Sequence, residues 1–385
     1  MATPTPKPKK VLILSCHMGQ GHMSAAKAIK AGVEQLYKKE LSAEIVDLVE
    51  ILSPLVNRVA QKTYDRLARG PLFKILFKTM DKKWRMKLLN RLNYRFALKK
   101  IDKLFTEKKP DIVISTWPVW DYIVLKILKK QQLKCKFISI ITDSIMVHNA
   151  WVIADADYHI VPNTDTAESA HALGVKSKKI KTLGFPVRLD FLKKTDRQSF
   201  LKKLKLNPKN FTVLFLPTVQ KTSKNLTIMK ELLKAKDRNI IIITGRDKKI
   251  TPKFARYKNR KNIKIMGWTD QMPDFIKSAD IVITKAGGAT VMECIAAQKP
   301  IIITSTIARH EAGNAELIKR YKVGIIAKSR RPKLDQNILT IQKNYSKFRK
   351  NLKKIANPGA ALKIAEFINE IVSQTSAAKK RRAKT

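Results

Sequence analysis

The sequence has 385 residues, 44% of them hydrophobic, with only 13 glycines and 16 prolines. This length allows two domains with substantial cores, and the composition excludes a disordered chain. The 79 Lys+Arg residues against 30 Asp+Glu residues give a formal net charge of +49, which attracts polyanions such as nucleic acid or an anionic bilayer. A host with a uniformly basic proteome, or simple solubilisation, would explain the same charge.

The three cysteines, Cys16, Cys135 and Cys294, are far apart and show no metal-ligand spacing. We therefore expect reduced thiols and a cytoplasmic protein. The polar start of the chain leads into no apolar signal region, and no run approaches the ~18 apolar residues that a transmembrane helix needs. Any association with a membrane is predicted to be peripheral, on its cytoplasmic face.

The first predicted strand, Val11–Ser15, and the first predicted helix, Ser24–Tyr37, are joined by a turn that contains Gly19, Gly21 and His22. Glycines in such a turn let the backbone approach a substrate. A histidine, with an unperturbed pKa of ~6.5, can present a general base near neutral pH. The motif alone is weak, because a loop histidine is often only a cap or a surface residue. We take His22, at the helix entrance, as the candidate base.

The segment 58–109 is strongly basic, with 17 Lys+Arg and 4 Asp+Glu residues, a net +13. Apolar side chains recur in it at helical spacing, namely Phe73, Phe77, Met80, Trp84 and Leu88. A basic amphipathic helix with aromatic residues is typical of an interfacial membrane anchor, where each cation near an anionic surface contributes ~1 kcal/mol. An ordinary helix with its stripe in the core is the alternative. Nucleic-acid binding is a third interpretation, but no recognition motif accompanies the charge, and no specific nucleic acid is expected.

Short apolar strands continue along the chain with helices between them, at 111–115, 137–142, 158–161, 180–183, 212–216, 240–244, 263–266, 281–284 and 300–304. This alternation predicts parallel, doubly wound sheets. Ligands bind at the carboxyl ends of the strands in such sheets. In the first half, Trp117, Asp143 and His148 follow strand ends. The acidic pair at 155–157 resembles that of metal-dependent sugar transferases, but its position before a strand favours a structural role.

In the second half, Arg246 and Met266 lie at strand ends, where Arg246 is suited to pairing with a phosphate. Gly287 and Gly288 follow the strand 281–284 and begin a helix, whose free N–H groups and positive dipole end favour a phosphate. Glu293, about a turn and a half further on, is placed to bind ribose hydroxyls. A polar loop containing His310–Asn314 follows the next strand. The sequence therefore predicts a nucleotide site in this half.

These motifs, in this order, resemble the lipid glycosyltransferases that include monogalactosyldiacylglycerol synthases and processive diacylglycerol glucosyltransferases. The resemblance covers roughly residues 11–371. It rests on the Gly19-Gln20-Gly21-His22 loop, on the Thr142-Asp143 segment with His148, and on a donor signature in the second half. That signature is the most specific part, because its elements occur in the order and spacing of the family.

The resemblance implies the GT-B fold: two Rossmann-like doubly wound domains facing across a cleft, with the last helix crossing back to the first domain. It places an acceptor and membrane-docking domain at 8–187 with a helix at 357–374, a UDP-sugar domain at 188–350, and a basic disordered tail at 375–385.

The resemblance also implies an inverting, metal-independent transfer of a hexose from UDP-glucose or UDP-galactose to diacylglycerol, with no cofactor. His22 is then the catalytic base, and the acceptor side contains Gly19, Gly21, Trp117, Asp143 and His148. The implied donor site consists of Arg246, Met266, Gly287, Gly288, Thr290, Glu293, Glu311, Gly313 and Asn314. The expected partners are the UDP-sugar, diacylglycerol, and an anionic membrane surface that binds segment 58–109.

Three alternatives stay open from the sequence. A UDP-sugar epimerase of the same fold would use the nucleotide site without a lipid. A non-enzymatic polyanion-binding protein would need only the charge. A related transferase would use a different lipid acceptor.

Overall fold

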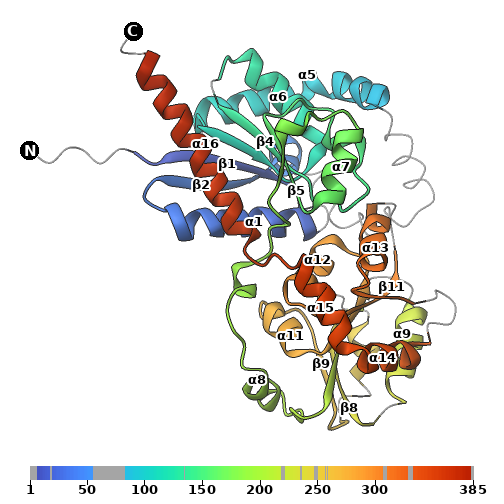
Figure 1. Cartoon of the computed structure of the whole chain (residues 1–385). Helices are drawn as coiled ribbons and strands as arrows, with labels where there is room; N and C mark the ends of the chain where they lie inside the picture. The colour runs from blue at the N-terminus through green and yellow to red at the C-terminus, as the bar shows by residue number, and fades with distance from the viewer. Residues whose placement is uncertain are drawn as a thin grey trace, which may run out of the picture. The chain divides into compact units, whose positions relative to one another are not determined.

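The computed structural model divides the chain into two compact units, Met1–Leu189 with Gly359–Thr385, and Asp190–Pro358 (Figure 1). The structure describes residues 7–17, 20–54, 83–133, 135–217, 222–234, 236–246, 250–255, 257, 259–306, 310–327 and 333–382. Two predictions fall on other residues: Gly19 and the first part of the basic segment, 58–82, lie outside this described part. Among the described residues, no helix is both long and apolar enough to cross a membrane.

The first unit contains a six-stranded parallel sheet in the order β2-β1-β3-β4-β5-β6. Its strands are β1 (Lys9–Ser15), β2 (Leu41–Asp47), β3 (Ile112–Ser115), β4 (Lys136–Ile140), β5 (Tyr158–Val161) and β6 (Ile180–Thr182). Strand order reverses between β1 and β3, so the ends of these two strands form the switch point at which doubly wound sheets bind ligands.

Helices cover both faces of this sheet. On one face, α1 (Gln20–Tyr37) and α16 (Ala360–Arg382) pack on apolar residues of β1, β3, β4 and β5. Figure 1 shows α16, in red, running alongside these first elements of the chain. On the other face lie α2 (Leu48–Leu52), α5 (Lys83–Lys108) and α6 (Asp121–Lys130). The short helices η1 (Pro118–Trp120), η2 (Asn149–Trp151), α7 (Thr164–Ala172) and η3 (Ser177–Lys179) complete the unit.

The structure corrects the sequence predictions at three places in this unit. Helix α1 begins at Gln20, so His22 lies in its first turn and not before it. The last part of the basic segment belongs to the core, because Ile101 and Phe105 of α5 are fully buried against the sheet. Helix α16 continues to Arg382, where a disordered tail was predicted from 375. The residues added to the helix are rich in alanine, lysine and arginine, which have high helix propensity.

The second unit contains another six-stranded parallel sheet, in the order β12-β11-β10-β7-β8-β9. Its strands are β7 (Phe211–Phe215), β8 (Arg238–Ile243), β9 (Ile263–Met266), β10 (Ile281–Lys285), β11 (Ile301–Ser305) and β12 (Gly324–Ile326). Read from β9, this is the 3-2-1-4-5-6 order of dinucleotide-binding folds, with the switch point between β7 and β10. Strand β12, which the sequence analysis did not predict, is only three residues long.

Helices α9 (Thr222–Leu232), α10 (Thr251–Ala255) and α14 (Leu334–Lys343) share one core with the strands. Helix α11 (Met272–Ser278) packs on β7, flanked by α8 (Arg197–Lys203) and α12 (Gly288–Ala296). The unit is completed by η4 (Leu189–Phe191), α13 (His310–Arg320) and α15 (Tyr345–Ile355). The predicted polar loop around His310 is therefore wrong: Glu311, Gly313 and Asn314 lie in the first turns of α13.

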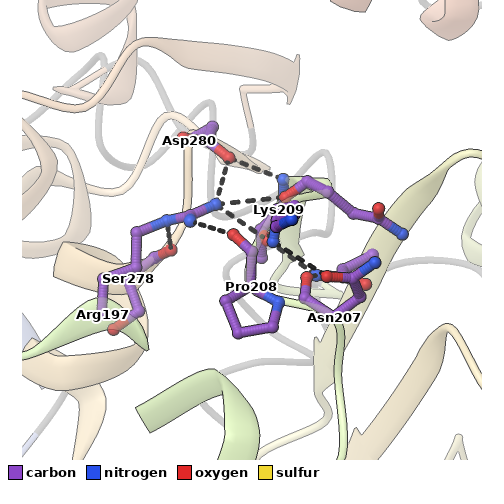
Figure 2. A network of polar contacts seen from close by, with 9 residues as sticks. Arg197, Asn207, Pro208, Lys209, Ser278 and Asp280 are labelled. Carbon is purple, nitrogen blue, oxygen red and sulfur yellow. Dashed lines mark hydrogen bonds and ion pairs between the residues drawn. The ribbon is translucent and has the colours of Figure 1, made fainter. Parts of the chain in front are cut away.

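The guanidinium group of Arg197 ties α8 to the amino ends of β7 and β10 (Figure 2). It donates to the carbonyl oxygens of Ser278 at 3.1 Å and Pro208 at 2.5 Å, and to Asp280 at 2.9 Å. The same carboxylate oxygen of Asp280 accepts from the N–H of Thr212 at 2.7 Å. Because these bonds gather at the amino ends of the strands, they leave the carboxyl ends available for ligands.

Candidate functional site

The imidazole of His22 is held at the switch point of the first unit. Its Nδ1 lies 2.8 Å from the carbonyl oxygen of Thr116, which follows β3, and 3.1 Å from Oγ1 of Thr142, which follows β4. A carbonyl oxygen can only accept, so Nδ1 carries the proton and Nε2 carries the lone pair when the ring is neutral. The geometry therefore sets the tautomer that a general base on Nε2 requires.

Trp151 and Asp143, which follow β4 in the chain, form the next contacts around His22. The ring of Trp151, buried in η2, lies 6.1 Å from that of His22 with a tilt of 46°. The indole N–H of Trp151 donates to Asp143 at 2.8 Å, which fixes the ring orientation. Asp143 is thus linked to His22 through Trp151, and its predicted acceptor-side role stays a prediction.

The other acceptor-side residues have structural contacts in the first unit. Nδ1 of His148 accepts from the N–H of Ala150 at 3.1 Å and caps η2. Gly21 lies in the first turn of α1, and Trp117 is half-buried directly before η1. His17, the other histidine of the turn, pairs with Asp47 at 2.6 Å, and that carboxylate also caps α2.

In the second unit, β10 ends in a lysine beside the predicted phosphate turn. A Cβ atom added to Gly287 would lie 3.3 Å from Cε and 3.5 Å from Nζ of Lys285, so the ammonium group is close to the start of α12. Gly287 is the N-cap of α12 and offers no side-chain cap, so the first helical N–H groups and Lys285 are positioned to share an anion. The sequence analysis did not select Lys285. Its position as the last residue of a buried strand, directly before the glycines, was the available signal.

Helix α13 is anchored to the same strand end. Glu311, buried in its first turn, forms an ion pair with Lys285. The side-chain amide of Asn314 donates to the carbonyl oxygen of Ala286 at 2.9 Å. Lys224 of α9 donates to the carbonyl oxygen of Thr304 at 2.8 Å, and burial lowers the pKa of this lysine. Glu311 and Asn314 therefore contact the end of β10 and the residue after it, while their predicted contact with a sugar or phosphate stays a prediction.

The other residues predicted for the donor site lie in two places, at the ends of β8 and β9 and on α12. The guanidinium of Arg246 stacks over the exposed ring of Trp268 at 4.9 Å, beyond the ends of β8 and β9. The carbonyl oxygen of Met266 accepts from the N–H of Thr244 at 2.9 Å. Thr290 and Glu293 are partly buried on α12, in its first turn and in its middle. Their predicted roles toward a donor are untested by these contacts.

The described residues contain no group of three or more His, Cys, Asp and Glu side chains that could hold a metal ion. The acidic pair at 155–157 has structural partners: Asp157 accepts from the N–H of Phe137 at 2.9 Å, and Asp155 forms an ion pair with Lys179. Hydrogen bonding to Lys179 lowers the pKa of Asp155. These contacts therefore favour the structural role that the sequence predicted for the pair.

Comparison with solved structures identifies the fold as GT-B. A structure of MurG from Acinetobacter baumannii has a TM-score of 0.61 at 15% identity, over 94% of this chain and 100% of that chain. A structure of MnaA from S. aureus with UDP also has a TM-score of 0.61, at 12% identity, over 94% of this chain and 96% of that chain. At these identities the similarity establishes the fold alone.

Sequence comparison identifies relatives over most of the chain. Monogalactosyldiacylglycerol synthase 1 of Arabidopsis thaliana is 27% identical over 387 residues, which cover 95% of this chain and 72% of the relative. A processive diacylglycerol beta-glucosyltransferase of Bacillus licheniformis is 24% identical over 356 residues, covering 90% of this chain and 91% of the relative. Residues 22–187 match the family model for monogalactosyldiacylglycerol (MGDG) synthase, and residues 218–375 match that for the glycosyltransferase family 28 C-terminal domain. The chain is therefore a glycosyltransferase that resembles monogalactosyldiacylglycerol synthases and processive diacylglycerol glucosyltransferases along most of its length.

Proposed function

We propose that this glycosyltransferase transfers a hexose from a UDP-sugar to the free hydroxyl of diacylglycerol at an anionic membrane surface, with inversion at the sugar carbon. The observation that carries the proposal is the match of residues 22–187, which begins at His22, to the MGDG synthase model. This half contains the proposed base, and the relatives are named for the product monogalactosyldiacylglycerol or for glucosyl transfer to diacylglycerol.

His22 is the proposed general base. Its Nε2 takes the proton of the acceptor hydroxyl while the oxygen attacks the anomeric carbon of the sugar and the bond to UDP breaks. The hydrogen bond from Nδ1 to the carbonyl oxygen of Thr116 supports this role. As positive charge develops on the ring, that carbonyl oxygen and the hydroxyl of Thr142 lie where they stabilise it.

The proposed donor site lies at the switch point of the second unit. The diphosphate of the UDP-sugar binds the N–H groups at the start of α12 and the ammonium group of Lys285, which together stabilise the leaving group. Glu293 binds the ribose, and Glu311 with Asn314 orients the sugar or the phosphate. Arg246 and Trp268 offer a stacking surface for the nucleobase of the UDP-sugar. No metal enters this mechanism.

The proposed membrane contact uses the basic segment 58–109. Its net charge of +13 favours an anionic surface, with each nearby cation contributing ~1 kcal/mol. From Ala97 on, one face of α5 packs in the core through Ala97, Ile101 and Phe105, so there only the exposed lysines of the helix are available to the membrane. This proposal gives the protein a peripheral location on the cytoplasmic face.

The test is an assay with UDP-glucose or UDP-galactose and diacylglycerol in vesicles that contain anionic lipid, followed by thin-layer separation of the lipids. We expect a glycolipid with one of the two donors and less product when the anionic lipid is replaced by a neutral one. Absence of a glycolipid with every UDP-sugar tried would overturn the proposal.

The same assay, together with vesicle binding and a thermal-shift measurement with UDP, separates the alternatives. An epimerase would convert the UDP-sugar without lipid, which is detected in the aqueous phase. A polyanion-binding protein would bind vesicles and show no thermal shift with UDP. A glycolipid formed only when another lipid replaces diacylglycerol would change the acceptor and keep the reaction class.

A further inference from the structure

A buried carboxyl group joins the carboxyl ends of β3 and β4. Asp121, the first residue of α6, is 1% exposed. Its two oxygens accept hydrogen bonds from Ser115 at 2.5 Å and from Ser139 at 3.0 Å. The two serines are paired in register on neighbouring strands. One side chain therefore fixes the ends of the two strands after which Thr116 and Thr142 lie.

The peptide group between Thr116 and Trp117 connects this carboxyl group to His22. Its N–H donates to Oγ of Ser115 at 3.3 Å, and its carbonyl oxygen accepts from Nδ1 of His22 at 2.8 Å. A trans peptide is planar, with N–H and C=O pointing in opposite directions, so fixing one end sets the direction of the other. The hydroxyl of Ser115 is in turn directed by Asp121.

The acceptor at position 121 matters for this direction. When the hydroxyl of Ser115 donates to Oδ1 of Asp121, its lone pairs are available to the N–H of Trp117. The carbonyl oxygen of Trp117 also lies within 3.0 Å of the same hydroxyl. A donor at position 121 would allow the hydroxyl to turn toward that carbonyl and would weaken its hold on the peptide.

We propose that Asp121 is a positioning residue for the transfer reaction, which acts through Ser115 and the 116–117 peptide to keep His22 protonated on Nδ1 with its lone pair on Nε2. The inference rests on the proposed function, because it requires His22 to be the base. A second path supports it, since Ser139 lies on β4 three residues before Thr142, the other neighbour of Nδ1. Burial raises the pKa of Asp121 to about 7, against the effect of the two serine donors.

The test uses Asp121→Asn, which keeps the shape and adds a donor, and Ser115→Ala, which removes the hydroxyl. We expect each variant to lower kcat by up to about a hundredfold, as a small displacement of a catalytic group does, while KM for the UDP-sugar is unchanged. The ¹⁵N chemical shifts of the His22 ring, assigned with His22→Gln, should move from the Nδ1–H tautomer toward a mixture. A link that served only to hold two strands together would lower Tm without moving these shifts.

The matched control is Asp157→Asn. Asp157 accepts from the N–H of Phe137 at 2.9 Å and so holds the amino end of β4, opposite the His22 end. It should lower Tm and leave kcat and the His22 tautomer as in the wild type. If Asp121→Asn does not fold, Ser115→Ala alone decides the question.

The outcomes separate this inference from the proposed function. Wild-type kcat and a wild-type His22 tautomer in Ser115→Ala and in folded Asp121→Asn would overturn the positioning role, even where His22→Ala is inactive. Wild-type turnover in His22→Ala would instead remove His22 as the base and, with it, the ground for the inference.

Discussion

Lys285, the last residue of β10, forms an ion pair with Glu311 in the first turn of α13. The pair joins two elements at the carboxyl edge of the second sheet, and its cation lies beside the Gly287 turn. Glu311 is buried while Lys285 is partly exposed, so the lysine is the partner that an incoming anion can reach. We infer that a bound diphosphate competes with Glu311 for this ammonium group.

The first prediction concerns this lysine. Lys285→Met should weaken UDP binding about tenfold or more, because a hydrogen bond to a charged group contributes ~1.5–3 kcal/mol. Gly287→Ala should weaken it less, since the added methyl group displaces the end of a flexible side chain. Calorimetric titration with UDP measures both, and Lys347→Met on α15 is the charge-matched control.

If Gly287→Ala acts by displacing Lys285, the double variant should bind UDP no more weakly than Lys285→Met alone. Contacting residues are expected to show such non-additivity. Fully additive losses would place the effect of Gly287 on the helix N-terminus and not on the lysine.

The second prediction concerns His22. Loss of a general base typically lowers a rate by 10²–10⁴-fold, so His22→Ala should reduce kcat by about that factor. UDP affinity should be unchanged, because UDP is proposed to bind the second unit. Turnover is measured in the vesicle assay and binding by titration with UDP. A variant that loses UDP affinity and turnover together would point to a fold defect.

The third prediction concerns the contact between α1 and α16. A Cβ atom at Gly32 would lie 2.6 Å from the carbonyl oxygen of Ala361, a backbone atom that cannot swing aside. Overpacking costs ~1–3 kcal/mol or more, which exceeds the gain of ~1 kcal/mol from replacing a helical glycine by alanine. Gly32→Ala should therefore lower Tm and increase amide exchange in α16.

Gly359→Ala is the control for this variant, because a Cβ atom there would meet no atom within 4 Å. It should leave Tm and the exchange of α16 close to the wild type. If amide exchange in α16 were equally slow in Gly32→Ala and Gly359→Ala, α1 and α16 would be packed less closely than the 2.6 Å contact at Gly32 implies.

The fourth prediction concerns His159, on β5. Burial lowers its pKa from 6.5 to about 4. The folded protein thus binds a proton at His159 more weakly than the unfolded chain does. The contribution of neutral His159 to the free energy of unfolding is therefore complete above pH 6.5 and is lost as pH falls toward 4. The loss amounts to roughly 3 kcal/mol, at 1.36 kcal/mol per pKa unit.

His159→Phe should remove this loss, measured as the free energy of unfolding between pH 7 and pH 4. Asp121 titrates in an overlapping range with the opposite sign, because its raised pKa makes stability fall as pH rises from 3.8 to about 7. The difference between wild type and His159→Phe cancels that contribution. A pH-independent difference would show that His159 is not desolvated in the folded state.

Much of the fold was accessible from the sequence, because buried parallel strands are short apolar runs and helices between them have their own period. The two doubly wound sheets follow from that alternation, as does the glycine turn at the carboxyl end of β10. Strand β12 was missed because a three-residue strand carries almost no pattern. The helical start of α13 was missed because its polar residues resemble a loop.

For the site, the sequence by itself determined which residue types follow each strand, and hence that a histidine lies in one unit and a glycine turn in the other. It did not determine the contacts that give those residues their chemistry. The tautomer of His22 depends on the carbonyl oxygen of Thr116, and the position of Lys285 depends on Glu311. These partners are 94 and 26 residues apart in the sequence. Only the folded sheets bring them within hydrogen-bond distance, because strand order, and not spacing along the chain, decides which strand ends are neighbours.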